Sequence, residues 1–178
     1  IDFWTGAFLI VLLTGVYTVL GGLRAVVYTE TIQTVVLLAG SAVTLIFGLQ
    51  AIGGWNAMVE TAGPDFMSIW KPSDHKDFPW TGIVLGAPIL GIWYWCTDQN
   101  IVQRVLSAKN ISEARRGTIF AGFLKITPLF LFVIPGVIAF SLAAKGQLNL
   151  SSSDSALPTL IKTLLPSGLR GMVATGLL

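Results

Sequence analysis

Long apolar runs separated by short polar segments dominate the pattern of this chain. A helix needs about 20 residues to cross a bilayer, and several runs approach or exceed that length. They cover residues 3–20, about 25 or 31 to 49, about 80–97 and about 118–144. An amphipathic piece near 157–165 precedes the start of a fifth run. We therefore predict an all-α fold, that of a polytopic helical membrane protein, with a break between the first two runs at Gly21 to Arg24.

The polar segments near 54–79, 104–117 and 145–166 are expected to lie outside the bilayer. Basic residues in short loops mark the cytoplasmic side of a membrane protein. The segment between the third and fourth runs is short and holds four of them, whereas the longer loop after the second run holds two. We expect Arg24 and 104–117 in the cytoplasm, and 54–79 and 145–166 on the outer side.

The composition supports lipid as the solvent. Hydrophobic residues make up 53% of the 178 residues and charged residues 11%, whereas soluble domains carry about 25% charged residues. The net charge of +2 and the lack of a basic run with interleaved aromatics argue against nucleic acid as a partner. One histidine, one cysteine and no phosphate-binding glycine motif argue against an enzyme or a cofactor site. We interpret 1–178 as the central part of one transmembrane domain, with about four spans and the start of a fifth.

Lys125 is the only charged residue between Thr118 and Ala144. Ten helical residues separate it from Arg115, which is about 15 Å, or half of the roughly 30 Å hydrocarbon thickness. Pro128 follows, and a proline there is expected to leave the carbonyl of Leu124 without its helical partner. Lys125 either faces a wet cavity that a polar cargo visits, or pairs with a carboxylate on another helix.

The third run combines helix-breaking residues with aromatic ones. Broken helices at membrane depth line cavities in transporters, so we predict a break in the middle of this run. Tyr94 and Trp95 could then stack on a sugar ring. Alternatively, the glycines permit close helix packing and the aromatics form an interfacial belt. The residues behind this prediction are Gly82, Gly86, Pro88, Gly91 and Trp93.

Glu30 stands where the second run begins, beside Tyr28 and Thr29. Its carboxylate is either part of an ion pathway or an acid at a helix N-terminus, where the helix dipole favours negative charge. Position alone favours the second interpretation.

Several segments together resemble the sodium/solute symporter family, and within it the sodium/glucose cotransporters. They are GGLRAVVYTETIQT at 21–34, WYWCTDQNIVQRVLSAKN at 93–110, Leu124-Lys125 with Pro128 and Pro135-Gly136, and LPSGLRG at 165–171. The resemblance runs through nearly all of the chain and is weakest in the two outer loops.

This resemblance implies a five-plus-five inverted-repeat symporter fold with discontinuous helices, of which this chain carries core helices four to seven and the start of the eighth. It implies sodium-coupled symport of a glucose- or galactose-like sugar by alternating access, in an integral protein of the plasma membrane. Myo-inositol or another small polar solute is the alternative cargo, and a channel or sensor that uses the same cavity is the alternative class.

By position, the resemblance also assigns substrate-binding residues. Tyr94 resembles an aromatic gate on the sugar, Trp95 its neighbour and Lys125 a donor to sugar hydroxyls. Gly91 stands where relatives place Asn, Thr or Ser, and Glu30 stands where an Asp near the sodium pathway is usual. Sodium is the implied coupling ion, no cofactor is implied, and no complete sodium site is expected within this chain.

Overall fold

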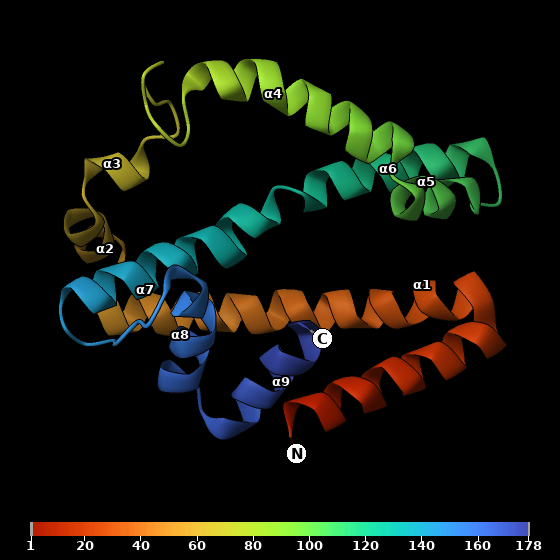
Figure 1. Cartoon of the computed structure of the whole chain (residues 1–178), viewed down its shortest axis with the longest axis horizontal. Helices are drawn as coiled ribbons and strands as arrows, with labels where there is room; N and C mark the ends of the chain where they lie inside the picture. The colour runs from red at the N-terminus through yellow and green to blue at the C-terminus, as the bar shows by residue number, and fades with distance from the viewer. Residues whose placement is uncertain (1, 178) are drawn as a thin grey trace. The chain divides into compact units, whose positions relative to one another are not determined.

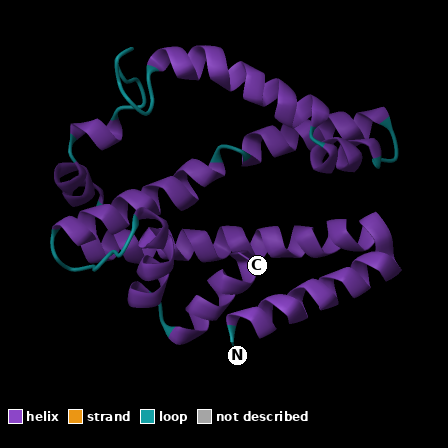
Figure 2. Ribbon diagram, in the orientation of Figure 1, coloured by secondary structure: helices purple, strands orange, loops and turns teal. Residues whose placement is uncertain are grey.

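Helices account for most of the structure, a computed structural model that describes residues 2–177. Within these residues the only β-type pairing is an isolated bridge between Lys71 and Pro79, and no strand is drawn (Figure 2). The all-α prediction is confirmed. In chain order the elements are α1 (Phe3–Ile52), α2 (Trp55–Ala62), α3 (Pro64–Met67), α4 (Trp80–Ile92), the π-helix η1 (Trp93–Thr97), α5 (Gln99–Leu106), α6 (Ile111–Leu124), the π-helix η2 (Leu129–Val133), α7 (Ile134–Ala144), the 3₁₀-helix η3 (Ser153–Ser155), α8 (Ala156–Leu164) and α9 (Ser167–Leu177).

The chain divides into two compact units. The first comprises Ile1–Ser41 with Ser167–Leu178, and the second Ala42–Pro166. Helix α1 contributes residues to both units, α9 lies in the first, and the elements from α2 to α8 lie in the second.

In the first unit, α1 folds back on itself at Gly22 (Figure 1). This residue has φ 58° and ψ −159°, a left-handed backbone conformation that favours glycine because a Cβ would meet the neighbouring carbonyl. The two arms of α1 on either side of Gly22 correspond to the first and second apolar runs. The predicted break at Gly21 to Arg24 is thereby confirmed.

Helix α9 packs closely on the second arm of α1 within the same unit. A Cβ at Gly176 would lie 2.9 Å from backbone atoms of Leu37, and one at Gly40 would lie 2.9 Å from a methyl group of Val173. Glycine at these two positions therefore permits the close approach of the two helices.

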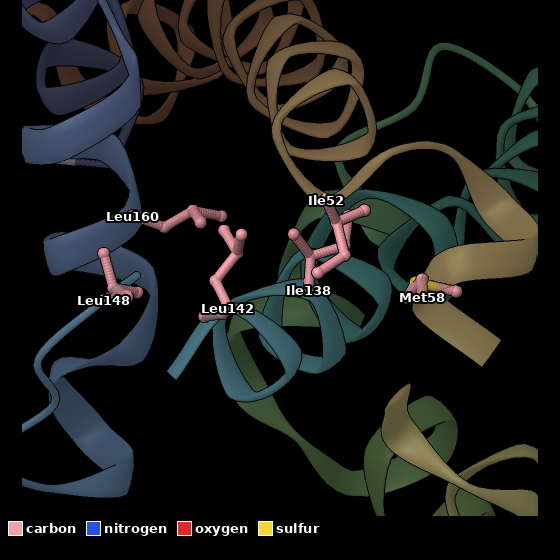
Figure 3. Packing of buried hydrophobic residues seen from close by; sticks show 7 residues of the cluster. Ile52, Met58, Ile138, Leu142, Leu148 and Leu160 are labelled. Atoms are coloured by element: carbon pink, nitrogen blue, oxygen red, sulfur yellow. The ribbon is translucent and has the colours of Figure 1, made fainter. Parts of the chain in front are cut away.

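The second unit is held together by a hydrophobic core in which the end of α1, α2, α7 and α8 meet. Figure 3 shows its buried side chains pointing toward one another from these helices and from the loop before η3. Beside this core, the Lys145 ammonium group donates a hydrogen bond of 3.3 Å to the carbonyl of Ile52, the last residue of α1. The fully or nearly buried members are Ile52, Met58, Ile138, Ala139, Leu142, Leu148 and Leu160.

Two stretches of the described residues are long and apolar enough to cross a membrane, Trp4–Ile52 and Ile111–Ala144. The first covers the first two predicted runs, and the second covers the fourth. The third predicted run corresponds to the 13 residues of α4 followed by the 5 residues of η1.

Candidate functional site

The third apolar run does not break in its middle. Helix α4 continues from Trp80 through Pro88 to Ile92, so the prediction of a break among Gly82 to Gly91 is wrong. The physical reason is that these glycines tolerate helical geometry and one proline removes only a single backbone donor. The departure from α-helix begins instead at Trp93.

The aromatic triplet lies on the π-helix η1. Here the amide of Asp98 donates to the carbonyl of Trp93 at 3.0 Å, which is the wide spacing of a π-helix. The hydroxyl of Thr97 donates to the same carbonyl at 2.8 Å. Asp98 then leaves the helix in an extended conformation and its Oδ1 accepts the amide of Ile101 at 3.2 Å, which starts α5. Such π segments are frequent at functional sites.

The discontinuity in the described residues of the fourth run lies at Lys125, which ends α6. The carbonyl of Leu124 lacks its helical amide partner, as predicted, because residue 128 is proline, and the Thr127 hydroxyl donates to it at 2.7 Å instead. Thr127 thus replaces the amide that Pro128 lacks. The chain then continues through η2 into α7.

Lys125 and Tyr94 come together across these two irregular segments. The Lys125 ammonium nitrogen lies 4.0 Å from the centroid of the Tyr94 ring, which is a cation–π contact. Tyr94 also meets Trp95 edge to face, with centroids 5.4 Å apart. Among the described residues, no carboxylate forms an ion pair with Lys125.

The same residues line an open cavity of about 540 Å³. Its wall consists of the end of α4, η1 and α6, and it includes all four residues that the sequence assigned to the substrate: Gly91, Tyr94, Trp95 and Lys125. Tyr94, Trp95 and Lys125 also line a second cavity of about 290 Å³, which continues between α5 and α6. The four residues therefore share one site, and their role in binding stays a prediction.

Sequence analysis missed Gly122, which lines the larger cavity from α6. Its spacing was the available signal, because residues three apart on a helix share a face and Gly122 precedes Lys125 by three.

Glu30 belongs to the other unit of the chain. The preferred interpretation, an acid at a helix N-terminus, is wrong, because the second arm of α1 starts directly after Gly22 and Glu30 lies about two turns inside it. The dipole effect fades beyond the first turn. The half-buried Glu30 side chain stays a candidate for the ion pathway.

Lys71 and Asp65 form an ion pair in the loop before α4. Lys71 donates to the carboxylate of Asp65 at 2.6 Å and also to its backbone carbonyl. This hydrogen bond and the nearby positive charge hold the pKa of Asp65 below its ordinary value. Stacked rings of Trp70 and Trp80, with centroids 6.1 Å apart, flank the loop.

Within the described residues, no group of three or more His, Cys, Asp and Glu side chains could hold a metal ion.

Comparison with known proteins gives one family. The whole chain, residues 1–178, matches the family described as the sodium:solute symporter family. Sodium/glucose cotransporter 1 of Sus scrofa is 35% identical over 213 residues, covering 100% of this chain and 32% of that protein.

Two other relatives agree. A sodium/mannose cotransporter of Bos taurus is 36% identical over 203 residues, covering 97% of this chain and 34% of that protein. Sodium/glucose cotransporter 4 of Homo sapiens is 36% identical over 199 residues, covering 95% of this chain and 29% of that protein. The chain thus spans about a third of the length of the curated relatives it matches.

Proposed function

Because the chain belongs to the sodium:solute symporter family, we propose that it is the central part of a transporter that couples sodium entry to sugar uptake. Glucose and galactose are the first candidates for the cargo, since relatives carry the name sodium/glucose cotransporter. Such a protein is a transporter and not an enzyme.

The observation that carries this proposal is the contact between Lys125 and Tyr94 on the wall of a cavity. An ammonium group in an otherwise apolar span costs free energy unless it faces water or a polar partner. Lys125 has donors for sugar hydroxyl groups, and the rings of Tyr94 and Trp95 offer flat apolar faces for the C–H side of a sugar. Together these groups suit an uncharged, hydroxyl-rich ring.

Sodium supplies the driving force in this mechanism. At a potential of about 100 mV and a tenfold gradient, one ion provides about 2.3 kcal/mol from the potential and about 1.4 kcal/mol from the gradient. The total of about 3.7 kcal/mol supports several-hundred-fold accumulation of the cargo. One coupled ion therefore suffices for uptake.

Coupling requires two states of the protein. Sodium stabilises an outward-open state, the sugar binds beside Lys125, and the helices then rock to release both inside, which is alternating access. The departures from α-helix at Trp93–Thr97 and at Lys125 are the points at which α4 and α6 can bend. We expect the remaining helices of the five-plus-five arrangement in parts of the transporter outside this chain, and no complete sodium site within it. The plasma membrane is its proposed location.

Gly91 points to an alternative cargo. Gly91 has no side chain to hydrogen-bond a sugar hydroxyl, so a different sugar, or a polyol such as myo-inositol, is the alternative.

Uptake by the complete transporter in proteoliposomes tests the proposal. Labelled glucose or galactose should accumulate above its outside concentration with sodium, and not when choline replaces sodium. Flux that only equilibrates with either cation would indicate a channel, and binding without flux would indicate a sensor. Either result would contradict sodium-coupled symport.

A further inference from the structure

Two side chains hold the end of the π-helix that carries Tyr94. The carbonyl of Trp93, the first residue of η1, accepts the amide of Asp98 at 3.0 Å and the hydroxyl of Thr97 at 2.8 Å. Asp98 then leaves the helix with φ −64° and ψ 118°, and its Oδ1 accepts the amide of Ile101 at 3.2 Å. These hydrogen bonds join the two ends of η1, and Tyr94 lies between them.

The Thr97 hydroxyl acts at the carbonyl where the hydrogen-bond spacing changes. In a regular α-helix, the carbonyl of Trp93 would accept the amide of Thr97, four residues on. In η1 it accepts the amide of Asp98, five residues on. A threonine hydroxyl that donates to the carbonyl four residues back bends a helix, and a side chain inserted among the backbone hydrogen bonds is a cause of kinks. The hydroxyl of Thr97 therefore favours the wider π spacing over the α spacing.

The spacing of η1 determines where the Tyr94 ring lies. A π-helix changes the rotation per residue, so a return to α spacing would turn this side chain in another direction. The ring centroid now lies 4.0 Å from the Lys125 ammonium nitrogen and 5.4 Å from the centroid of Trp95. A cation–π contact extends to about 6 Å from the centroid, so a shift of the ring by more than about 2 Å would remove it.

We propose that Thr97 is a positioning residue for cargo binding, whose hydroxyl holds η1 in the π spacing and thereby keeps Tyr94 against Lys125. This inference rests on the proposed function, in which Tyr94 and Lys125 contact the sugar. Thr97 is not among the described residues that line the two cavities beside Tyr94. It acts through Tyr94 and not by contact with the cargo.

Sodium-dependent glucose uptake by the complete transporter in proteoliposomes tests the inference. Thr97→Val removes the hydroxyl and keeps the branched side chain. It should raise the apparent KM for glucose by about two- to tenfold, the range that corresponds to one neutral hydrogen bond, and leave kcat nearly unchanged. Thr97→Ser keeps the hydroxyl and should restore the wild-type KM. Thr175→Val is the matched control, because the Thr175 hydroxyl donates to the carbonyl of Gly171 at 2.8 Å within the regular helix α9.

A double-substitution cycle with Tyr94→Leu shows whether Thr97 acts through Tyr94. Leucine removes the ring that the π-helix positions, so adding Thr97→Val to Tyr94→Leu should change the affinity by less than about twofold. Equilibrium binding of labelled glucose to the detergent-solubilised transporter measures all four proteins of the cycle. Effects that multiply in the double variant would show that Thr97 acts independently of Tyr94, and would overturn the inference.

Other results would also decide against it. A wild-type KM in Thr97→Val, with or without a lower kcat, would overturn the inference alone and leave sugar symport intact, and so would a raised KM in Thr97→Ser equal to that of Thr97→Val. If Thr97→Val does not fold, Thr97→Ala takes its place. Failure of both to fold, while Thr97→Ser folds, would show a structural role only. Absence of sodium-dependent sugar uptake by the wild type would overturn the proposed function together with this inference.

Discussion

Lys125 and Tyr94 meet at two places where helices lose their regular geometry. The ammonium nitrogen lies 4.0 Å from the ring centroid, Lys125 ends α6, and Tyr94 lies within the π-helix η1. A regular α-helix at Tyr94 would turn its side chain through a different angle, because a π-helix changes the rotation per residue. The contact therefore depends on the π-helix.

Lys125→Ala should weaken sugar binding strongly in the complete transporter. A hydrogen bond to a charged group contributes about 1.5–3 kcal/mol, which corresponds to a rise in the apparent KM for glucose of about 10- to 150-fold. Lys162→Ala, on the exposed side of α8, is the control and should leave KM unchanged. Concentration-dependent uptake measures both variants, and an unchanged KM in Lys125→Ala would remove this lysine from the site.

Tyr94→Leu should reduce affinity, whereas Tyr94→Phe should retain most of it. Phenylalanine keeps the ring face that the Lys125 ammonium contacts and the edge-to-face contact with Trp95, while leucine removes both. Together these contacts correspond to about 1–3 kcal/mol. Equilibrium binding of labelled sugar to the detergent-solubilised transporter distinguishes the variants. Equal losses in both would mean that the hydroxyl group, and not the ring, makes the important contact.

The sequence predicted the all-α class, and the four residues that it grouped, Gly91, Tyr94, Trp95 and Lys125, line one cavity. It did not predict where α4 gives way to the π-helix η1. Length and apolar composition dictate helices in a bilayer, and Gly22 has a conformation that glycine adopts most easily. The location of a helix break depends on which freed carbonyl finds a substitute donor. At Leu124 that donor is the Thr127 hydroxyl. A threonine hydroxyl can donate to several nearby carbonyl groups. The positions of proline and glycine alone therefore do not predict which carbonyl it reaches.

Thr127→Val should destabilise the protein at the junction of α6 and η2. The substitution removes the hydroxyl that donates to the carbonyl of Leu124 at 2.7 Å, and an unsatisfied polar group away from water costs about 1–3 kcal/mol. Thr127→Ser keeps the hydroxyl and should restore the wild-type value. The thermal midpoint in detergent is the measurement, and equal midpoints for the Val and Ser variants would show that the hydrogen bond contributes nothing.

Gly176→Ala should weaken the packing of α9 on the second arm of α1. The added Cβ would lie 2.9 Å from the backbone of Leu37, which cannot move aside as a flexible side chain can. Overpacking of this kind costs about 1–3 kcal/mol. Gly171→Ala on the same helix meets no described atom within 4 Å and is the matched control. A lower thermal midpoint for Gly176→Ala alone is expected, and identical midpoints would contradict the close approach.

The loop before α4 should loosen in acid because of its ion pair. Lys71 holds the pKa of Asp65 below the ordinary value of 3.8, so the folded loop favours the charged carboxylate more than the unfolded chain does. The resulting stabilisation is fully present above that ordinary value and is lost as the pH falls through the lowered pKa of the folded state.

Hydrogen exchange of 64–80, corrected for the intrinsic pH dependence of exchange, measures this effect. Protection should fall between pH 5 and pH 2 in the wild type, since those limits bracket the ordinary pKa of 3.8 for the Asp65 carboxyl group. Lys71→Met removes the partner of Asp65, so this variant should show weaker protection at pH 5 and little further loss in acid. If the variant loses as much protection between the two pH values as the wild type does, the pairing of Lys71 with Asp65 is not the cause, and other carboxyl groups of the loop would have to account for the change.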